Sequence, residues 1–159
     1  MKRLKKINLI KRENRGFTLI ELLLVLAIIG VLTSFLLVNF IGAKARARDA
    51  QRKSDMRQLQ AAFELYRADQ GIYPASPLPA CGPSSPGLVN NGTTYIQKIP
   101  CDPLNTGQYS YTYTQTGAGS GYTLIACLEN VNDSQKDATN NSGLCTGGNT
   151  NWSYTLTNP

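Results

Sequence analysis

The sequence has 159 residues, which leaves room for one small domain and one further segment. It holds 16 lysines and arginines against 10 acidic residues, a net charge of +6. Residues 1–16 contain seven basic side chains and one acidic side chain, so the excess marks a basic leader and not a nucleic-acid-binding surface. The sequence has no histidine, which excludes Ser–His and Cys–His catalytic pairs, and it has no phosphate-binding glycine motif. We therefore expect a protein that is not an enzyme.

Residues 17–42 form a long apolar segment directly after this leader. A helix from Phe17 to Ile41 spans roughly 37 Å at ~1.5 Å per residue, enough to cross a hydrocarbon layer of ~30 Å. Secretory signals are shorter, with about 7–15 apolar residues. A buried core helix is the alternative, but a soluble domain of this size could hardly surround so apolar a helix. The segment predicts a single membrane span.

The charges on the two sides of the span predict its orientation. Both flanks are positive, but the leader carries more charge and comes first, so the positive-inside rule places the C-terminal domain outside the cytoplasm. The basic run after the span consists of Lys44, Arg46, Arg48, Arg52, Lys53 and Arg57. Its default interpretation is a solvated helix face or a contact with membrane lipid, and DNA binding is a weaker alternative.

The next segment, residues 43–70, continues as an amphipathic helix. Its apolar residues recur at steps of three and four: Met56, Leu59, Ala62, Phe63 and Tyr66. No proline interrupts the segment, so we expect one continuous helix with the span before it. Gly71 is expected to end this helix in a left-handed conformation, and Pro74 prevents its continuation.

Residues 71–159 are expected to form a loop-rich β domain. Alternating residues on either side of the glycine-rich turn at 115–121 indicate a hairpin of residues 109–114 and 122–128, and residues 152–156 are a weaker third strand. A small antiparallel sheet packed on the helical stripe would bury both apolar faces. The predicted fold class is therefore α+β, a long N-terminal helix packed on a small sheet.

Four cysteines lie in this domain, an even number in a Pro/Gly-rich segment, as is typical of an oxidising compartment. Zinc binding is disfavoured because no Cys-x₂-Cys pair and no histidine are present. Of the three possible pairings we favour the two that close short loops, Cys81–Cys101 and Cys127–Cys145.

The segment RGFTLIELLLVLAIIGVL, residues 15–32, resembles the N-terminal signature of type IV prepilins and of type II secretion pseudopilins. The resemblance implies that a prepilin peptidase cleaves after Gly16 and methylates the new N-terminus, Phe17. It also implies that Glu21 pairs with the Phe17 amine of a neighbouring subunit during assembly. The alternative is a carboxylate that reaches water or stays protonated, because an ionised carboxylate in hydrocarbon is costly.

The segments at 66–74, 99–114 and 122–129 resemble the helix end and β-region of the major pseudopilins more loosely. Many members carry a proline at the position of Val38, and this chain does not. Major pseudopilins often bind calcium in a C-terminal loop, but no such loop can be matched here residue by residue. Oxygen ligands could come from Asn130, Asn132, Asp133 and Asp137. They lack EF-hand spacing, so a solvated loop is the favoured interpretation, and we expect no cofactor.

These observations predict a structural subunit of a type IV pilus or pilus-like filament, made as a prepilin and polymerised from the bacterial cytoplasmic membrane. The alternatives are a pseudopilin of a type II secretion system and a membrane-tethered binding or adhesion domain that never polymerises. The resemblance implies three partners: the prepilin peptidase, an inner-membrane assembly platform and further copies of the chain, in a helical homopolymer. DNA uptake has no support from the sequence.

Overall fold

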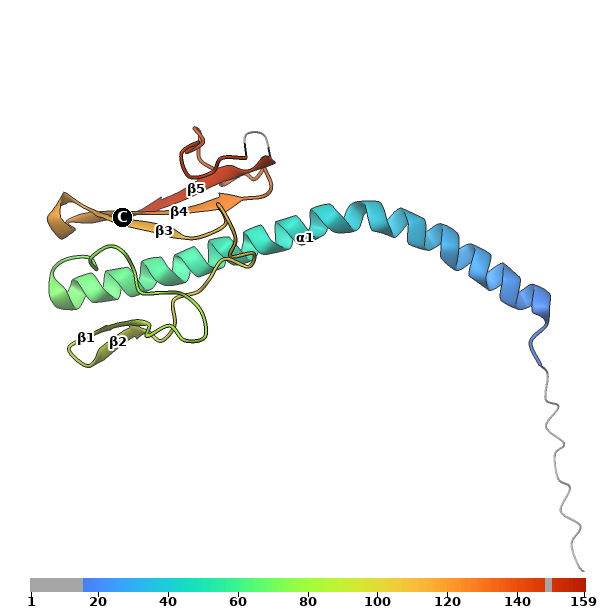
Figure 1. Ribbon diagram of the computed structural model, residues 1–159, viewed down its shortest axis with the longest axis horizontal. Helices are drawn as coiled ribbons and strands as arrows, with labels where there is room; N and C mark the ends of the chain where they lie inside the picture. The colour runs from blue at the N-terminus through green and yellow to red at the C-terminus, as the bar shows by residue number, and fades with distance from the viewer. Residues whose placement is uncertain (1–15, 148–149) are drawn as a thin grey trace, which may run out of the picture. The chain divides into compact units, whose positions relative to one another are not determined.

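A computed structural model describes residues 16–147 and 150–159 of the chain, and the side chains of residues 35–39 lie outside the description. Apart from Gly16, the predicted leader also lies outside the described residues. The chain divides into two compact units, Met1–Phe40 and Ile41–Pro159. Helix α1, Leu19–Gln70, belongs to both (Figure 1). Each unit is described by itself.

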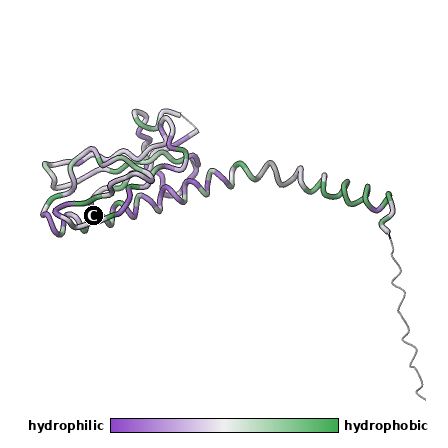
Figure 2. Tube along the Cα trace, turned by 60° about the horizontal axis from the view of Figure 1, so that its bottom comes forward, coloured by the Kyte–Doolittle hydropathy of each residue, from purple (hydrophilic) through white to green (hydrophobic). Residues whose placement is uncertain are grey.

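The described part of the first unit is helical from Leu19 onward, and its apolar side chains are exposed. They include Leu22, Leu23, Leu26, Ile28, Ile29 and Leu32. Figure 2 shows these hydrophobic residues along the first part of α1 and hydrophilic residues along its second part. The sequence analysis predicts a membrane span at residues 17–42. In the part of the chain that the structure describes, no helix is both long enough and apolar enough to cross a membrane.

The second unit is organised around the C-terminal half of α1. The predicted apolar stripe is buried, since Met56, Leu59 and Phe63 are each 0% exposed. The helix ends as expected: Gly71 has a φ of 77°, and its N–H donates to the Arg67 carbonyl oxygen at 2.8 Å. This left-handed residue satisfies one of the carbonyl groups left without a partner in the last turn.

Three antiparallel strands pack on this stripe: β3, Thr112–Thr116; β4, Gly121–Leu128; and β5, Trp152–Thr157 (Figure 1). Pairs such as Tyr113 with Leu124 fix the register between β3 and β4. The ring of Phe63 lies 4.8 Å from that of Tyr113 and 5.2 Å from that of Tyr122. The predicted α+β fold is confirmed. The first strand begins three residues later than predicted, and the first of these residues, Tyr109, instead pairs with Thr106 in a turn.

The sequence analysis missed a second, smaller sheet. It is a hairpin of β1, Leu88–Asn90, and β2, Thr93–Ile96, joined by Asn91 and Gly92. Both turn residues have positive φ, 48° and 80°, as the Asn-Gly turns of tight hairpins require. This dipeptide is a strong hairpin signal and could have revealed the hairpin. The strands of three and four residues are too short to show alternation.

Candidate functional site

The predicted cleavage site lies in an exposed, non-helical stretch before α1. Gly16, Phe17 and Thr18 are all exposed, and the Phe17 side chain is 82% exposed. A peptidase needs an extended and accessible chain, and a glycine before the cut places no Cβ in its way. On its described side, the predicted cut therefore lies in exposed chain outside the helix.

Glu21 closes a capping box at the start of α1, which the sequence analysis did not foresee. Its Oε2 accepts the backbone N–H of Thr18 at 2.9 Å and the Thr18 hydroxyl at 2.8 Å. The Glu21 N–H donates in return to Thr18 Oγ1 at 3.3 Å. The Thr-x-x-Glu pattern is the sequence signal for this arrangement. Both donors use one carboxylate oxygen, so the cap holds the Glu21 side chain in a fixed orientation within five residues of the cut.

A buried charge cluster holds the second unit together. The Arg52 side chain is 0% exposed and lies at its centre. Its Nε and Nη2 donate to the two carboxylate oxygens of Asp102 at 2.7 and 3.0 Å. Its Nη1 donates to Asp49 and to Glu129, each at 2.7 Å. The guanidinium also lies 4.7 Å from the centre of the Tyr109 ring. Arg52 thus joins α1 to the segment after Cys101 and to the end of β4.

The same cluster continues to the end of β4 through Arg48, which pairs with Glu129. The Arg48 hydrogen bond lowers the pKa of Glu129, against the effect of burial and with a further contribution from Arg52. Asp49 accepts the backbone N–H groups of Glu129 and Asn130 at 2.9 and 2.8 Å. Every carboxylate of this cluster therefore has cationic or N–H donors.

These contacts correct the interpretation of the basic run as a solvated helix face for three of its six members, whereas Lys44, Arg46 and Arg57 are exposed. Arg52 is fully buried, and Arg48 and Lys53 form ion pairs within the domain. The signal in the sequence was the three- and four-residue spacing of Asp49, Arg52 and Met56, which places them on the buried side of the helix. Arg52, with a side chain that is 0% exposed, is not available to nucleic acid or to lipid headgroups.

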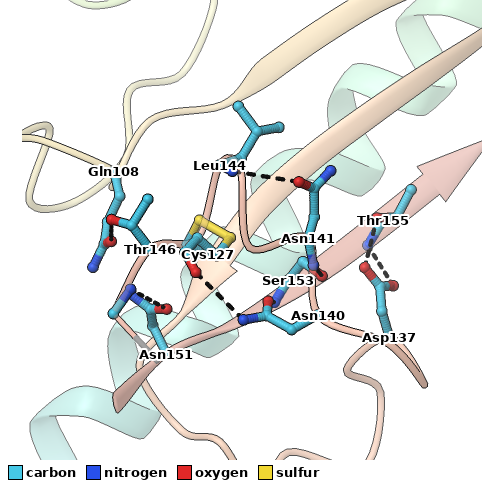
Figure 3. The surroundings of a disulfide bond; sticks show 12 residues. Gln108, Cys127, Asp137, Asn140, Asn141, Leu144, Thr146, Asn151, Ser153 and Thr155 are labelled. Atoms are coloured by element: carbon cyan, nitrogen blue, oxygen red, sulfur yellow. Dashed lines mark hydrogen bonds between the residues drawn. A yellow bond between two sulfur atoms is a disulfide. The ribbon is translucent and has the colours of Figure 1, made fainter. Parts of the chain in front are cut away.

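Two disulfides close the loops of the β domain. The bridges are Cys81–Cys101 and Cys127–Cys145, with sequence separations of 20 and 18, and they are the pairs that the sequence analysis favours. Cys127 lies on β4 but points away from the helix-facing residues, because neighbours along a strand alternate between faces. Cys127 and Cys145 are 2% and 0% exposed, so the connection from β4 to β5 covers the outer face of the sheet (Figure 3).

The four oxygen-bearing residues considered for calcium lie in this connection but do not form a metal site. Asp133 binds Lys53, and the Asp137 carboxylate accepts two donors from Thr155 (Figure 3). Within the described residues, no group of three or more His, Cys, Asp or Glu side chains could hold a metal ion. The donor set does not fit calcium, and the carboxylates are structural anchors instead of solvated groups.

Comparison with known proteins agrees with the N-terminal features. A model of the prokaryotic N-terminal methylation motif matches residues 11–37, and a model of type II secretion system protein G matches residues 39–142. The type II secretion system core protein G of Escherichia coli K12 is 29% identical over 140 residues, which cover 83% of this chain and 93% of that protein.

Two other relatives with the same name give similar values. The Vibrio cholerae protein is 33% identical over 105 residues, covering 63% of this chain and 71% of that protein. The Pseudomonas aeruginosa protein is 28% identical over 101 residues, covering 58% and 70%. No solved structure gives a significant match. The model of protein G covers more than half of the sequence, and the chain belongs to the type II secretion system protein G family.

Proposed function

We propose that this chain is a pseudopilin, the structural subunit of a type II secretion pseudopilus. The observation that carries the proposal is the adjacency of two matches, the methylation motif at 11–37 and protein G at 39–142. The prediction of a filament subunit with a prepilin-type N-terminus agrees with both matches. A type IV pilus subunit has the same build and remains the second candidate.

The subunit waits in the cytoplasmic membrane, with its apolar N-terminal half in lipid and its C-terminal domain outside. The prepilin peptidase cuts after Gly16 and methylates Phe17. An assembly platform in the inner membrane then brings subunits together into a helical homopolymer. The apolar side chains along the first unit leave lipid because neighbouring copies of the same helix offer an equally apolar environment.

Glu21 is the residue to which we assign docking. The cap fixes its carboxylate near the end of the mature chain, where the freed Phe17 amine of an adjacent copy can pair with it. Pairing removes two charges from the apolar surroundings at once. The basic leader would stand between the two groups before the cut, so assembly follows processing.

Two measurements on the same cells test this proposal. Mass spectrometry of membrane protein should give Phe17 as the first residue, carrying one methyl group. The Glu21→Ala variant should be cut normally, because the carboxylate lies after the cleavage site, but it should yield few filaments in sheared or detergent-free fractions. Deleting one partner of a buried ion pair costs about 3–5 kcal/mol, and that cost recurs with every subunit added.

A matched control separates docking from helix capping. Glu21→Gln retains an acceptor oxygen for Thr18 but not the charge, so it should fail in assembly as Glu21→Ala does. Normal filament yield from either variant would refute the docking role, and a mature chain that begins at Met1 would refute processing.

The two candidate filaments differ in what cells lose when the gene is deleted. Loss of protein secretion into the medium, with no change in long surface fibres, supports the pseudopilus. Loss of fibres built mainly of this chain, with secretion intact, would overturn it in favour of a pilus.

A further inference from the structure

The connection between β4 and β5, residues 129–151, is the longest stretch between two successive elements of the domain. It is tied to the sheet by the Cys127–Cys145 bridge and by hydrogen bonds with β5. Asp137 receives the Thr155 N–H and hydroxyl at 3.0 and 2.6 Å, and the Trp152 indole N–H donates to the Asp137 carbonyl oxygen at 2.6 Å. These contacts involve Asp137 and β5, and the first half of the connection, around residues 130–136, is stabilised by different contacts.

A lysine holds that half from within. The Lys136 ammonium donates to the Val131 carbonyl oxygen at 2.7 Å and lies 4.0 Å from the centre of the Trp152 ring. It thus bridges a turn of the connection and the first residue of β5. A cation over an indole face and on a carbonyl oxygen makes two favourable electrostatic contacts at once.

A second lysine comes from α1. Lys53 Nζ donates to Asp133 Oδ2 at 2.8 Å, and the two side chains are only 18% and 12% exposed. The other oxygen of Asp133, Oδ1, accepts the Gln135 N–H at 2.9 Å. Both carboxylate oxygens of Asp133 and both of Asp137 are therefore occupied by donors of the chain itself.

Calcium requires six to eight oxygen ligands, several of them carboxylates. In this connection a calcium ion would have to share Asp133 with the Lys53 ammonium and Asp137 with two Thr155 donors, and the Val131 carbonyl oxygen already accepts from Lys136. We infer that the Lys136 ammonium, together with the Lys53–Asp133 ion pair, supplies the positive charge that stabilises the β4–β5 connection, so that the connection folds without a divalent ion. This inference concerns the domain's stability and does not depend on which filament the subunit builds.

The chain offers a local probe, because Trp152 is its single tryptophan and lies against Lys136. The experiment uses the full chain in detergent, first stripped with EGTA. Thermal unfolding by circular dichroism and tryptophan emission are then recorded in EGTA and in excess CaCl₂. We expect the same Tm and the same emission spectrum in both solutions.

Three variants test the lysine directly. Lys136→Met should lower Tm by about 3–6 °C and change the Trp152 emission, because a charged hydrogen bond and a cation–π contact are lost. Lys136→Arg keeps a cation that can donate to a carbonyl and stack on the ring, so it should retain most of the wild-type Tm. Lys98→Met removes an exposed lysine outside the connection and should leave both measurements unchanged.

The inference is overturned by any of three results. A Tm that rises with CaCl₂ would show that a divalent ion stabilises the domain. An unchanged Tm and emission in Lys136→Met would show that the ammonium contributes nothing. A Tm of Lys136→Arg as low as that of Lys136→Met would show that the positive charge at this position is not what stabilises the connection.

Discussion

Replacing Arg52 by methionine tests whether the buried charge cluster stabilises the domain. Methionine retains much of the length and flexibility of the side chain, so the change mainly removes the guanidinium and its hydrogen bonds. The wild-type group makes four bonds to three carboxylates, at distances of 2.7 to 3.0 Å. After the substitution, Asp49 and Asp102 stay at 1% and 3% exposure without their shared cation.

The expected loss in the free energy of unfolding depends on the hydrogen-bond donors that each carboxylate keeps. Glu129 keeps Arg48, Asp49 keeps two backbone N–H donors, and Asp102 keeps the N–H of Leu104 at 2.9 Å. Removing one partner of a buried ion pair costs about 3–5 kcal/mol, and these remaining donors favour the lower end of that range. A domain of this size has a total stability of about 5–15 kcal/mol, so the loss is a large fraction of it.

Urea unfolding of the full chain in detergent, followed by circular dichroism, measures this loss. Arg57→Met is the matched control, because Arg57 is exposed on the same helix one and a half turns away and should cost less than about 0.5 kcal/mol. Arg52→Lys serves if the methionine variant does not fold. It keeps the charge but not the two-pronged contact with Asp102, so an intermediate loss is expected.

The reasoning would be refuted by an Arg52→Met variant that is as stable as the Arg57→Met control. Such a result would mean that the gain from the ion pairs only equals the cost of burying the charges.

Three further predictions concern the same domain. Replacing Cys127 and Cys145 by serines should lower the free energy of unfolding by about 3 kcal/mol, and reducing the wild type, which also opens Cys81–Cys101, should lower it further, as urea unfolding of the three samples will show. Tyr111→Phe removes the hydroxyl that donates to Asp55 at 2.8 Å, so urea unfolding should show a loss of about 1–3 kcal/mol, and a variant as stable as the wild type would argue against this bond. The pKa of Glu129 is lowered from 4.5, chiefly by the Arg48 hydrogen bond. The stabilisation by Glu129 is therefore present above pH 4.5 and is lost as the pH falls through the lowered pKa. Urea midpoints measured from neutral to acidic pH should fall less steeply in Glu129→Gln than in the wild type.

Local patterns in the sequence predicted most of the secondary structure. The stripe from Met56 to Tyr66 and the cap at Gly71 depend only on spacing along one helix, and both are present in the structure. Strand β4 is visible because its residues alternate and because the turn before it is rich in glycine. The hairpin of β1 and β2 was missed although Asn91 and Gly92 are typical of its turn. The flanking strands are too short to show an alternation of apolar and polar residues.

The N-terminal features are a different case, since they form one contiguous motif. Gly16, Phe17 and Glu21 lie within six residues, and their relation can be read without a fold. The capping box is equally local, with Thr18 three residues before Glu21, and it could have been predicted from the same segment. The motif gives no information on how a neighbouring subunit is placed against Glu21.

The sequence by itself determined the long helix, the sheet that covers it, the short-loop cysteine pairs and the prepilin-type N-terminus, because each depends on residues that are close along the chain. Only the tertiary structure decided which charged side chains are buried and which partners they have. Arg52 looks like one member of a basic run, yet its partners Asp102 and Glu129 lie 50 and 77 residues further on. A charged side chain can be buried only where such partners converge, and that convergence is a property of the folded chain and not of any segment of it.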